Sequence, residues 1–569
     1  MIFLSGFEHC QVGRRKVRDS AGTHVRVRLV GRDRDRSEVN AQGDKMSKES
    51  IPLSKDVRIG SGFQRYLTPT VLLGLILLLG VALRFYDLGT ESYWIDEMGT
   101  VVEVQQSIPQ ILASGRLDQP PAYYLPFHFW VNIFGTSEVS TRSFSALTGI
   151  GSIVLIYLIG RDLFGKSVGL LSAFLMAVTE IQIYYSQISR FYSFFEFMAL
   201  FSFLFFIMVL RSKKIIFFFL YGLASIIMVY GHTYGLFILI AQNLFFLIHA
   251  IKSRKAIATW LICQALIGLA LLPYLFPLLF RAGGIRGAVY LNIGGNSTPS
   301  ILDLIRSVYH FVFSPRRERS WQIILYNYIA AGALLVAGTW VHAIQQGKSK
   351  FLSTAREWVT ALQEVPALTS KILLVSCWLL CPIVLPFVAT LVIAPMYAEH
   401  YLISAAPALY LLLAFGVFSI RKMVPLIVSL GVLAIMIGPS LYNYYVTNTS
   451  EEWREVAAYI NENSGSGDVI VIAPNTGIGT QQKTFNWYYW GTLQSCGLDD
   501  PIPDSVVWKE LKQCVSGHER FWVIIRGNKN ELEYKRYTSF FLNPNQTVMH
   551  LIKEQQFVAI SVYLFELVK

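Results

Sequence analysis

The chain has 569 residues, of which 53% are hydrophobic and only 15% are charged. A soluble protein carries about 25% charged residues, and apolar runs of about 18 residues or more recur along this chain. The composition therefore indicates a polytopic membrane protein rather than a soluble one. The formal net charge of +12 does not indicate a nucleic-acid partner, because most Lys and Arg residues beyond the N-terminal segment lie between apolar runs, where they set membrane orientation.

Residues 1–66 differ from the rest of the chain. They are basic and poor in hydrophobic residues, with runs such as Arg14-Arg15-Lys16. No apolar segment follows within the distance typical of a signal peptide, so the pattern favours a disordered cytoplasmic tail over a cleavable secretory signal. Met46 offers an alternative start of translation, in which case the residues before it would be absent from the protein.

Eleven apolar segments within residues 67–444 are predicted to cross the membrane as helices. Their approximate bounds are 67–86, 141–160, 167–184, 192–210, 215–231, 236–251, 257–280, 321–345, 371–394, 401–420 and 423–443. Five short connections between them are basic, and all five fall on the same side as the N-terminal segment. The positive-inside rule then places the N-terminus in the cytoplasm, most simply at the plasma or inner membrane, and an odd number of spans places the C-terminal segment outside.

The expected outward side carries four larger features, at residues 87–140, 182–192, 281–320 and 445–569. The last of these begins with an amphipathic helical pattern at residues 451–460. Later apolar runs are typical of short strands, so a small outward-facing α/β domain is expected over residues 445–569. Cys496 and Cys514 both fall in this domain and could form a disulfide in an oxidising compartment, but the sequence leaves the pairing open.

Two adjacent carboxylates, Asp96 and Glu97, follow the first predicted span. Tyr93 and Trp94 precede them and are residue types that favour the depth of the lipid headgroups. Placing an acid at this depth costs free energy, and acids found there usually have a function. The pair therefore marks a candidate site. The aromatic segment 120–130 that follows is too short to span a bilayer, which predicts a lid of interfacial helices over the site.

Several segments occur in a fixed order along the chain. They are Asp96-Glu97, Asp118-Gln119-Pro120-Pro121-Ala122-Tyr123-Tyr124, Glu138 with Arg142, Tyr184 to Tyr192, Ala398-Glu399-His400-Tyr401-Leu402, and Glu452-Trp453-Arg454-Glu455. Together with the topology, this order resembles GT-C glycosyltransferases of the protein O-mannosyltransferase-like group, which includes the bacterial lipid A aminoarabinose transferases. The resemblance covers residues 67–475 and implies a GT-C fold.

The resemblance also implies a polyprenyl-phosphate-linked sugar donor and an acid of the first loop as general base. Elementary chemistry agrees, because an acceptor hydroxyl must lose its proton as it attacks the anomeric carbon, and a carboxylate can accept that proton. The phosphate leaving group needs positive charge rather than an acid. Asp96 is therefore the expected base and Glu97 its support. The alternative is a pair of solvated acids at a helix start, stabilised by the helix dipole.

Arg190 is the expected ligand of the donor phosphate, since arginine can pair bidentately with phosphate. The alternative is an interfacial arginine that extends to the headgroups. By resemblance, the substrate-binding set also takes in Tyr185, Gln187, Asp118, His232, His400 and Tyr401. Arg281 and Arg286 belong to a basic loop that suggests an anionic partner, although loops of this length cross the membrane regardless of charge.

Two positions depart from the family pattern. Ile188 stands where the family usually has an acid, and Gln119 stands where it commonly has a histidine. Both departures weaken the case for a metal assembled from these loops, so no metal ligand is assigned and a divalent metal remains an open question.

The sequence thus predicts a membrane glycosyltransferase that moves a sugar from a polyprenyl-phosphate donor to a hydroxyl or amine of a protein, lipid or glycan. The reaction would invert the anomeric centre on the outer or luminal face of the membrane. The alternative is a transporter or flippase for a lipid-linked saccharide. The transporter hypothesis is less favoured because no internal repeat is visible in the sequence and because transport needs no lid that bears an acid.

Overall fold

The computed structural model describes residues 68–113, 120–212, 214–250, 254–280, 299–312, 367–419, 423–448, 450–498, 504–527, 531–543 and 548–568. All of them belong to the compact unit Gly62–Lys569. The predicted tail, the predicted span at 321–345 and the predicted site residues Asp118, Arg281 and Arg286 lie outside the described residues.

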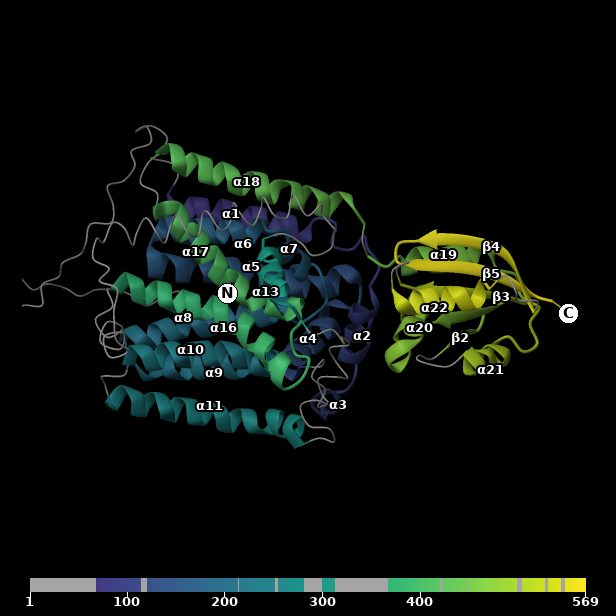
Figure 1. Cartoon of the computed structure of the whole chain (residues 1–569), viewed down its shortest axis with the longest axis horizontal. Helices are drawn as coiled ribbons and strands as arrows, with labels where there is room; N and C mark the ends of the chain where they lie inside the picture. The colour runs from purple at the N-terminus through teal and green to yellow at the C-terminus, as the bar shows by residue number, and fades with distance from the viewer. Residues whose placement is uncertain are drawn as a thin grey trace, which may run out of the picture. The chain divides into compact units, whose positions relative to one another are not determined.

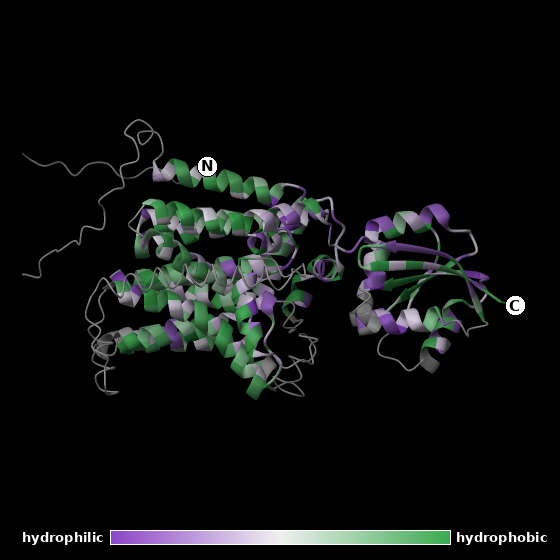
Figure 2. Cartoon of the chain, turned by 45° about the horizontal axis from the view of Figure 1, so that its top comes forward, coloured by the Kyte–Doolittle hydropathy of each residue, from purple (hydrophilic) through white to green (hydrophobic). Residues whose placement is uncertain are grey.

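Long apolar helices dominate the first part of the described chain (Figures 1 and 2). They are α1 (Pro69–Phe85), α5 (Glu138–Phe164), α6 (Lys166–Val178), α8 (Tyr192–Ser212), α9 (Ile215–Gly231), α10 (Gly235–Ala250), α11 (Arg254–Phe280), α16 (Ala367–Val392), α17 (Ala406–Ser419) and α18 (Met423–Val446). The short helix α7 (Glu180–Ser186) follows α6. By length and composition, six spans within the described residues are long and apolar enough to cross a membrane, or seven if α6 and α7 form one bent span. This confirms an integral multi-pass protein, while the total of eleven spans and the orientation remain predictions.

The segment predicted as one span at 167–184 is broken in the structure. Helices α6 and α7 meet at a bend of 61°, which leaves carbonyl groups at the end of α6 without helical partners. Arg84 of α1 is fully buried and donates hydrogen bonds to the carbonyl oxygens of Met176 at 2.9 Å and Ala177 at 3.1 Å, and to Oγ of Ser186 at 3.1 Å. A buried arginine in an apolar span thus stabilises the break that brings the following turn to the site.

Helices α5 and α6 are joined by Gly165, whose φ of 104° favours glycine. The two helices then cross closely, because a Cβ atom on Gly160 would lie 2.8 Å from Cα of Gly169. Helix α5 is therefore tightly fixed within the bundle, and its first turns carry two charged residues that matter below.

Short helices connect the longer ones on one side of the bundle: α2 (Ile95–Val104), α3 (Ile108–Ala113), α4 (Pro121–Phe134), α13 (Ile301–His310) and the 3₁₀ helix η2 (Glu399–Ala405). Helix α4 buries Tyr123, Tyr124 and Phe127 and leaves Phe129 and Ile133 exposed. This two-sided pattern suits a helix at a membrane interface. The loop after the first span thus contains the expected short helices, while their depth in a bilayer remains a prediction.

The C-terminal part folds as a mixed sheet with helices on both faces. The strands are β1 (Val469–Ala473), β2 (Ser495–Gly497), β3 (Arg520–Arg526), β4 (Met549–Phe557) and β5 (Ile560–Leu567), in the order β2-β1-β3-β5-β4. Strands β2, β1 and β3 are parallel, and β5 and β4 are antiparallel additions. The helices are α19 (Trp453–Asn463), α20 (Thr476–Tyr488), α21 (Asp504–Cys514) and α22 (Leu532–Phe541). The apolar runs predicted as strands form β1, β3 and β5.

Two apolar cores lie on the two faces of this sheet. Val471 and Val523 point to the core that contains Leu511 and Phe541 of α21 and α22. Ile470, Ile472 and Trp522 point to the other core, with Trp453 of α19 and Phe485 of α20. Alternate residues of each central strand pack into the two cores, so these strands are apolar throughout. The side that carries α19 and α20 is the one that reaches the candidate site.

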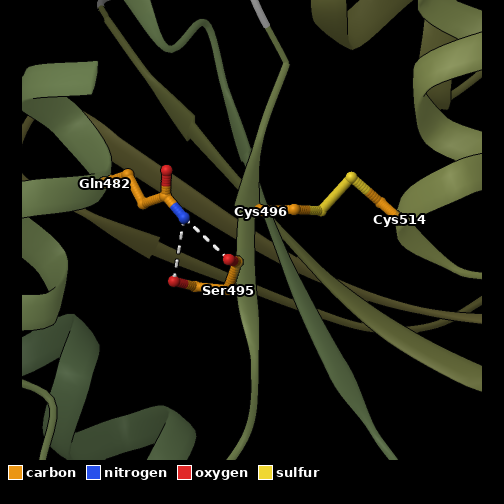
Figure 3. Close-up of a disulfide and its surroundings, with 4 residues drawn as sticks. All are labelled: Gln482, Ser495, Cys496 and Cys514. Carbon is orange, nitrogen blue, oxygen red and sulfur yellow. Dashed lines mark hydrogen bonds between the residues drawn. A yellow bond between two sulfur atoms is a disulfide. The ribbon is translucent and has the colours of Figure 1, made fainter. Parts of the chain in front are cut away.

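A disulfide joins Cys496 of the edge strand β2 to Cys514 at the end of α21 (Figure 3), with the two Cα atoms 6.1 Å apart. The side-chain amide of Gln482 donates to the carbonyl oxygen and to Oγ of Ser495 beside it. The pairing that the sequence left open is therefore present in the structure.

Replacing both cysteines by serine is expected to reduce the free energy of unfolding of the C-terminal domain by about 3 kcal/mol, the usual effect of opening a loop of this length. The sequence separation of the two cysteines is 18 residues. Thermal denaturation under non-reducing conditions measures the effect. Cys263→Ser is the matched control, because Cys263 forms no disulfide. Equal stability of the double variant and the control would refute a stabilising role for this bond.

Candidate active site

Asp96 and Glu97 lie side by side in the first turn of α2, where the helix dipole favours acids. Their environments differ completely. The side chain of Asp96 is 43% exposed, whereas that of Glu97 is fully buried. The structure therefore separates two carboxylates that are neighbours in sequence, and only Asp96 is accessible to a substrate.

Glu97 forms a buried bidentate ion pair with Arg142 of α5. Nε of Arg142 donates to one carboxylate oxygen at 3.0 Å and Nη2 donates to the other at 2.8 Å. The backbone N–H of Ser189 also donates to Glu97, at 2.7 Å. Arg142 further donates to the carbonyl oxygens of Leu88 and Ser92 in the chain before α2. These contacts hold α2, α5 and the turn after α7 together, and they fit the supporting role expected of Glu97.

Arg190, in the turn after α7, lies beside Asp96. Its Nη2 atom is 3.9 Å from a carboxylate oxygen of Asp96, and its Nη1 atom donates to Oγ1 of Thr100 at 2.9 Å. Its Nε atom is buried and has no hydrogen-bond partner among the described residues. Burial opposes the charge, but Asp96 helps to raise the pKa of Arg190 well above its ordinary value, so the guanidinium stays protonated.

An aromatic wall, which we define as Phe191, Tyr192, His232, His400 and Tyr401, lies next to Arg190. Ring centroids are 4.5 Å apart for His232 and Tyr401, 4.1 Å for His400 and Tyr401, and 5.8 Å for Tyr192 and His400. The guanidinium of Arg190 lies 5.0 Å from the ring of Phe191. The fold thus gathers residues from three distant parts of the chain beside one charged group.

His232 is neutral in this wall. Burial, followed by the charges of His400 and Arg190, lowers the pKa of His232 to about 3. Its Nδ1 atom accepts a hydrogen bond from the backbone N–H of Tyr234 at 3.2 Å. His232 therefore cannot supply positive charge to a phosphate near neutral pH, although its ring can line a binding site.

Two further predicted residues have different surroundings. Tyr185 packs on Tyr192, with ring centroids 4.7 Å apart, and so contacts the aromatic wall. The amide of Gln187 donates to carbonyl oxygens of Leu83, Arg84 and Tyr86 at the end of α1. Its oxygen accepts a hydrogen bond from the hydroxyl of Tyr444 at 2.6 Å. The structure uses Gln187 to join α1 to α18, so its role in substrate binding finds no support in these contacts.

The arrangement also includes three residues for which the sequence analysis predicts no role: Arg142, Thr100 and Ser189. Arg142 carried a usable signal, because a charged residue within an apolar span is expected to face inward and to find a partner. Thr100 and Ser189 carry no such signal. Among the described residues, no group of three or more His, Cys, Asp or Glu side chains could hold a metal ion.

Comparison with known proteins adds independent information. A family model described as dolichyl-phosphate-mannose-protein mannosyltransferase matches residues 118–276. A stretch of 119 residues is 31% identical to an uncharacterized protein of Aquifex aeolicus (strain VF5) and covers 19% of this chain and 23% of that protein. The chain therefore matches about a quarter of the length of that relative.

The fold is similar to that of ArnT from Cupriavidus metallidurans bound to undecaprenyl phosphate, with a TM-score of 0.52 and 11% identity over 87% of this chain and 98% of that chain. For the apo oligosaccharyltransferase of Archaeoglobus fulgidus the TM-score is 0.49, with 14% identity over 82% of this chain and 70% of that chain. The matched family model and the fold shared with ArnT confirm the resemblance seen in the sequence. The chain thus resembles dolichyl-phosphate-mannose-protein mannosyltransferases over residues 118–276 and has a fold similar to that of ArnT.

Proposed function

We propose that this protein transfers a sugar from a polyprenyl-phosphate donor to a hydroxyl or amine of a protein, lipid or glycan on the outer or luminal face of the membrane. The observation that carries the proposal is the pair formed by the accessible carboxylate of Asp96 and the buried, protonated guanidinium of Arg190. The structure of ArnT, whose fold is similar, contains undecaprenyl phosphate. A proton acceptor beside a phosphate-binding cation is the minimum that this transfer requires.

The reaction follows from these two groups. The acceptor oxygen or nitrogen attacks the anomeric carbon, and Asp96 takes the proton that the acceptor loses. The bond between the anomeric carbon and the phosphate oxygen breaks, and the electron pair leaves with the polyprenyl phosphate. Arg190 stabilises the charge that develops on this leaving group. A single displacement inverts the anomeric configuration and needs no second carboxylate, which agrees with the burial of Glu97 in an ion pair.

The nitrogen atoms of the Arg190 guanidinium differ in their contacts. Nη1 and Nη2 face Thr100 and Asp96, whereas Nε has no partner in the described part of the chain. A phosphate oxygen that accepts from Nε would satisfy this buried donor. The guanidinium would then lie between the acid and the phosphate and reduce their mutual repulsion.

Replacing Arg190 by glutamine is expected to raise the KM for the lipid-linked donor by about 10- to 100-fold, the value of one or two charge-assisted hydrogen bonds. Steady-state kinetics in lipid nanodiscs with varied donor concentration measures this effect. Arg211→Gln is the control, because Arg211 is half-exposed and pairs with Asp162 at the end of α8 that lies farther along the chain from Arg190. An unchanged donor KM in the Arg190 variant would rule out Arg190 as the phosphate ligand.

Acceptor dependence tests the proposal as a whole. Purified protein in nanodiscs is given an undecaprenyl- or dolichyl-phosphate sugar together with a peptide, a lipid or a glycan acceptor. We expect donor consumption with one acceptor class and little without an acceptor. If no combination of donor and acceptor is consumed, the proposed function fails.

A further inference from the structure

Helix α2, which carries Asp96, is held from two directions by the two residues on either side of Asp96. Glu97 is paired with Arg142 in the helical bundle. Ile95, two residues earlier, packs against the apolar core of the C-terminal domain that contains Trp453 and Phe485. Asp96 lies between these two anchors, so its position depends on both parts of the protein.

A second contact between α2 and the C-terminal domain runs along α20. A Cβ atom on Gly99 would lie 3.7 Å from Cγ2 of Thr480 near the start of α20. Tyr488 at the other end of α20 packs with Tyr93, Met98 and Val101. The residues of α2 and of the segment just before it therefore contact α20 near both of its ends.

The hydroxyl of Tyr488 is the polar centre of this contact. It accepts a hydrogen bond from the backbone N–H of Tyr93 at 2.8 Å and donates one to the carboxylate of Glu138 at 2.7 Å. Arg454 of α19 forms an ion pair with the same carboxylate and lies over the ring of Tyr488, 5.4 Å from its centroid. Glu138 begins α5, one turn before Arg142. One hydroxyl thus joins the C-terminal domain to the start of α2 and to the helix that binds Glu97.

We infer that Tyr488 is a positioning residue, through which the C-terminal domain sets the place of Asp96 for the reaction. The inference rests on the proposed function, because it concerns the rate of sugar transfer. Loss of the Tyr488 hydroxyl frees the N–H of Tyr93 and loosens the first turn of α2. Asp96 would then meet the acceptor in a less productive geometry, while Arg190 in its own turn would still bind the donor. The turnover number falls, and the donor KM does not change.

Tyr488→Phe and Tyr459→Phe form a matched pair of variants for the test. Both remove one hydroxyl from a tyrosine of the C-terminal domain. The hydroxyl of Tyr459 is buried and has no hydrogen-bond partner in the part of the chain that the structure describes. For the full-length protein in nanodiscs, we expect Tyr488→Phe to reduce kcat about tenfold or more at an unchanged donor KM, and Tyr459→Phe to keep the kcat of the parent protein.

Glu138→Gln provides a second variant if Tyr488→Phe does not fold. It keeps an acceptor for the Tyr488 hydroxyl but removes the charge that Arg454 pairs with. A smaller fall in kcat, again at an unchanged donor KM, is the expected result. A rise in donor KM without a fall in kcat, in either variant, would overturn the positioning role.

Amide hydrogen exchange provides a readout that needs no activity. In Tyr488→Phe, the amides of residues 93–97 should exchange faster than in the parent and in Tyr459→Phe, because the N–H of Tyr93 has lost its partner. If the parent transfers sugar and Tyr488→Phe has the same kcat, the inference is wrong and the proposed function stands. If the parent transfers no sugar, the proposed function fails and exchange decides the coupling: faster exchange only in Tyr488→Phe supports it, and equal exchange refutes it.

Discussion

Replacing Asp96 by asparagine is expected to reduce kcat for sugar transfer by about 10²- to 10⁴-fold, the usual contribution of a general base. The change keeps the size of the side chain and removes its ability to accept a proton. Because the side chain is 43% exposed and its nearest cation is 3.9 Å away, the variant should fold normally and keep the thermal stability of the parent. Initial rates at saturating donor, with a melting curve for each preparation, measure both properties.

Glu103→Gln is the control for this change. Glu103 lies on the same helix α2, about two turns beyond Asp96, and accepts a hydrogen bond from the hydroxyl of Tyr124. The substitution also converts a carboxylate of α2 to an amide, and it should leave kcat within a factor of about three. Comparable rates for Asp96→Asn and Glu103→Gln would remove Asp96 from the mechanism.

Replacing Arg142 by glutamine is expected to cost about 3–5 kcal/mol of stability, since it leaves the carboxylate of Glu97 buried without its counter-ion. The side chains are 5% and 0% exposed, so water cannot replace the lost partner. The variant also loses the bonds to the carbonyl groups before α2. We expect a clear fall in the midpoint of thermal unfolding in detergent, and a partial recovery in Glu97→Gln/Arg142→Gln, where no unpaired charge remains.

Arg211→Gln tests whether the stability lost in Arg142→Gln comes from the burial of the ion pair rather than from the removal of any arginine. Arg211 pairs with Asp162, but its side chain is 49% exposed, and such pairs contribute at most about 1 kcal/mol. The control should therefore melt close to the parent. Similar melting of both arginine variants would contradict a buried anchor at Glu97.

Much of the helical bundle could be predicted from the sequence, because uninterrupted apolar runs of span length have few alternatives. The break between α6 and α7 could not, since Thr179 and Glu180 lie in an otherwise apolar run and their partners are distant in sequence. Arg84 stabilises that break from α1, about ninety residues away. A charged residue in a span signals an internal partner but does not say which one.

The candidate site could also be predicted only in part from the sequence. Position and residue type, together with the family resemblance, indicated Asp96, Arg190 and His400, and the structure brings these elements together. The different environments of Asp96 and Glu97 could not be predicted, because they depend on Arg142 and on the N–H of Ser189. Gln187 looked like a binding residue in an aromatic turn, yet it bonds to the end of α1. Side-chain partners between distant elements are fixed by tertiary packing, which local patterns do not encode.

The chemical fate of a polyprenyl-phosphate sugar distinguishes sugar transfer from transport of the intact donor. A donor labelled separately in its sugar and in its lipid is incubated with the purified protein in proteoliposomes, with an acceptor present. For a glycosyltransferase we expect the two labels to separate: free polyprenyl phosphate accumulates, and the sugar appears on the acceptor with inverted anomeric configuration. If the labels stay together while the intact donor moves from one leaflet to the other, the protein is a transporter of lipid-linked saccharides and not a glycosyltransferase.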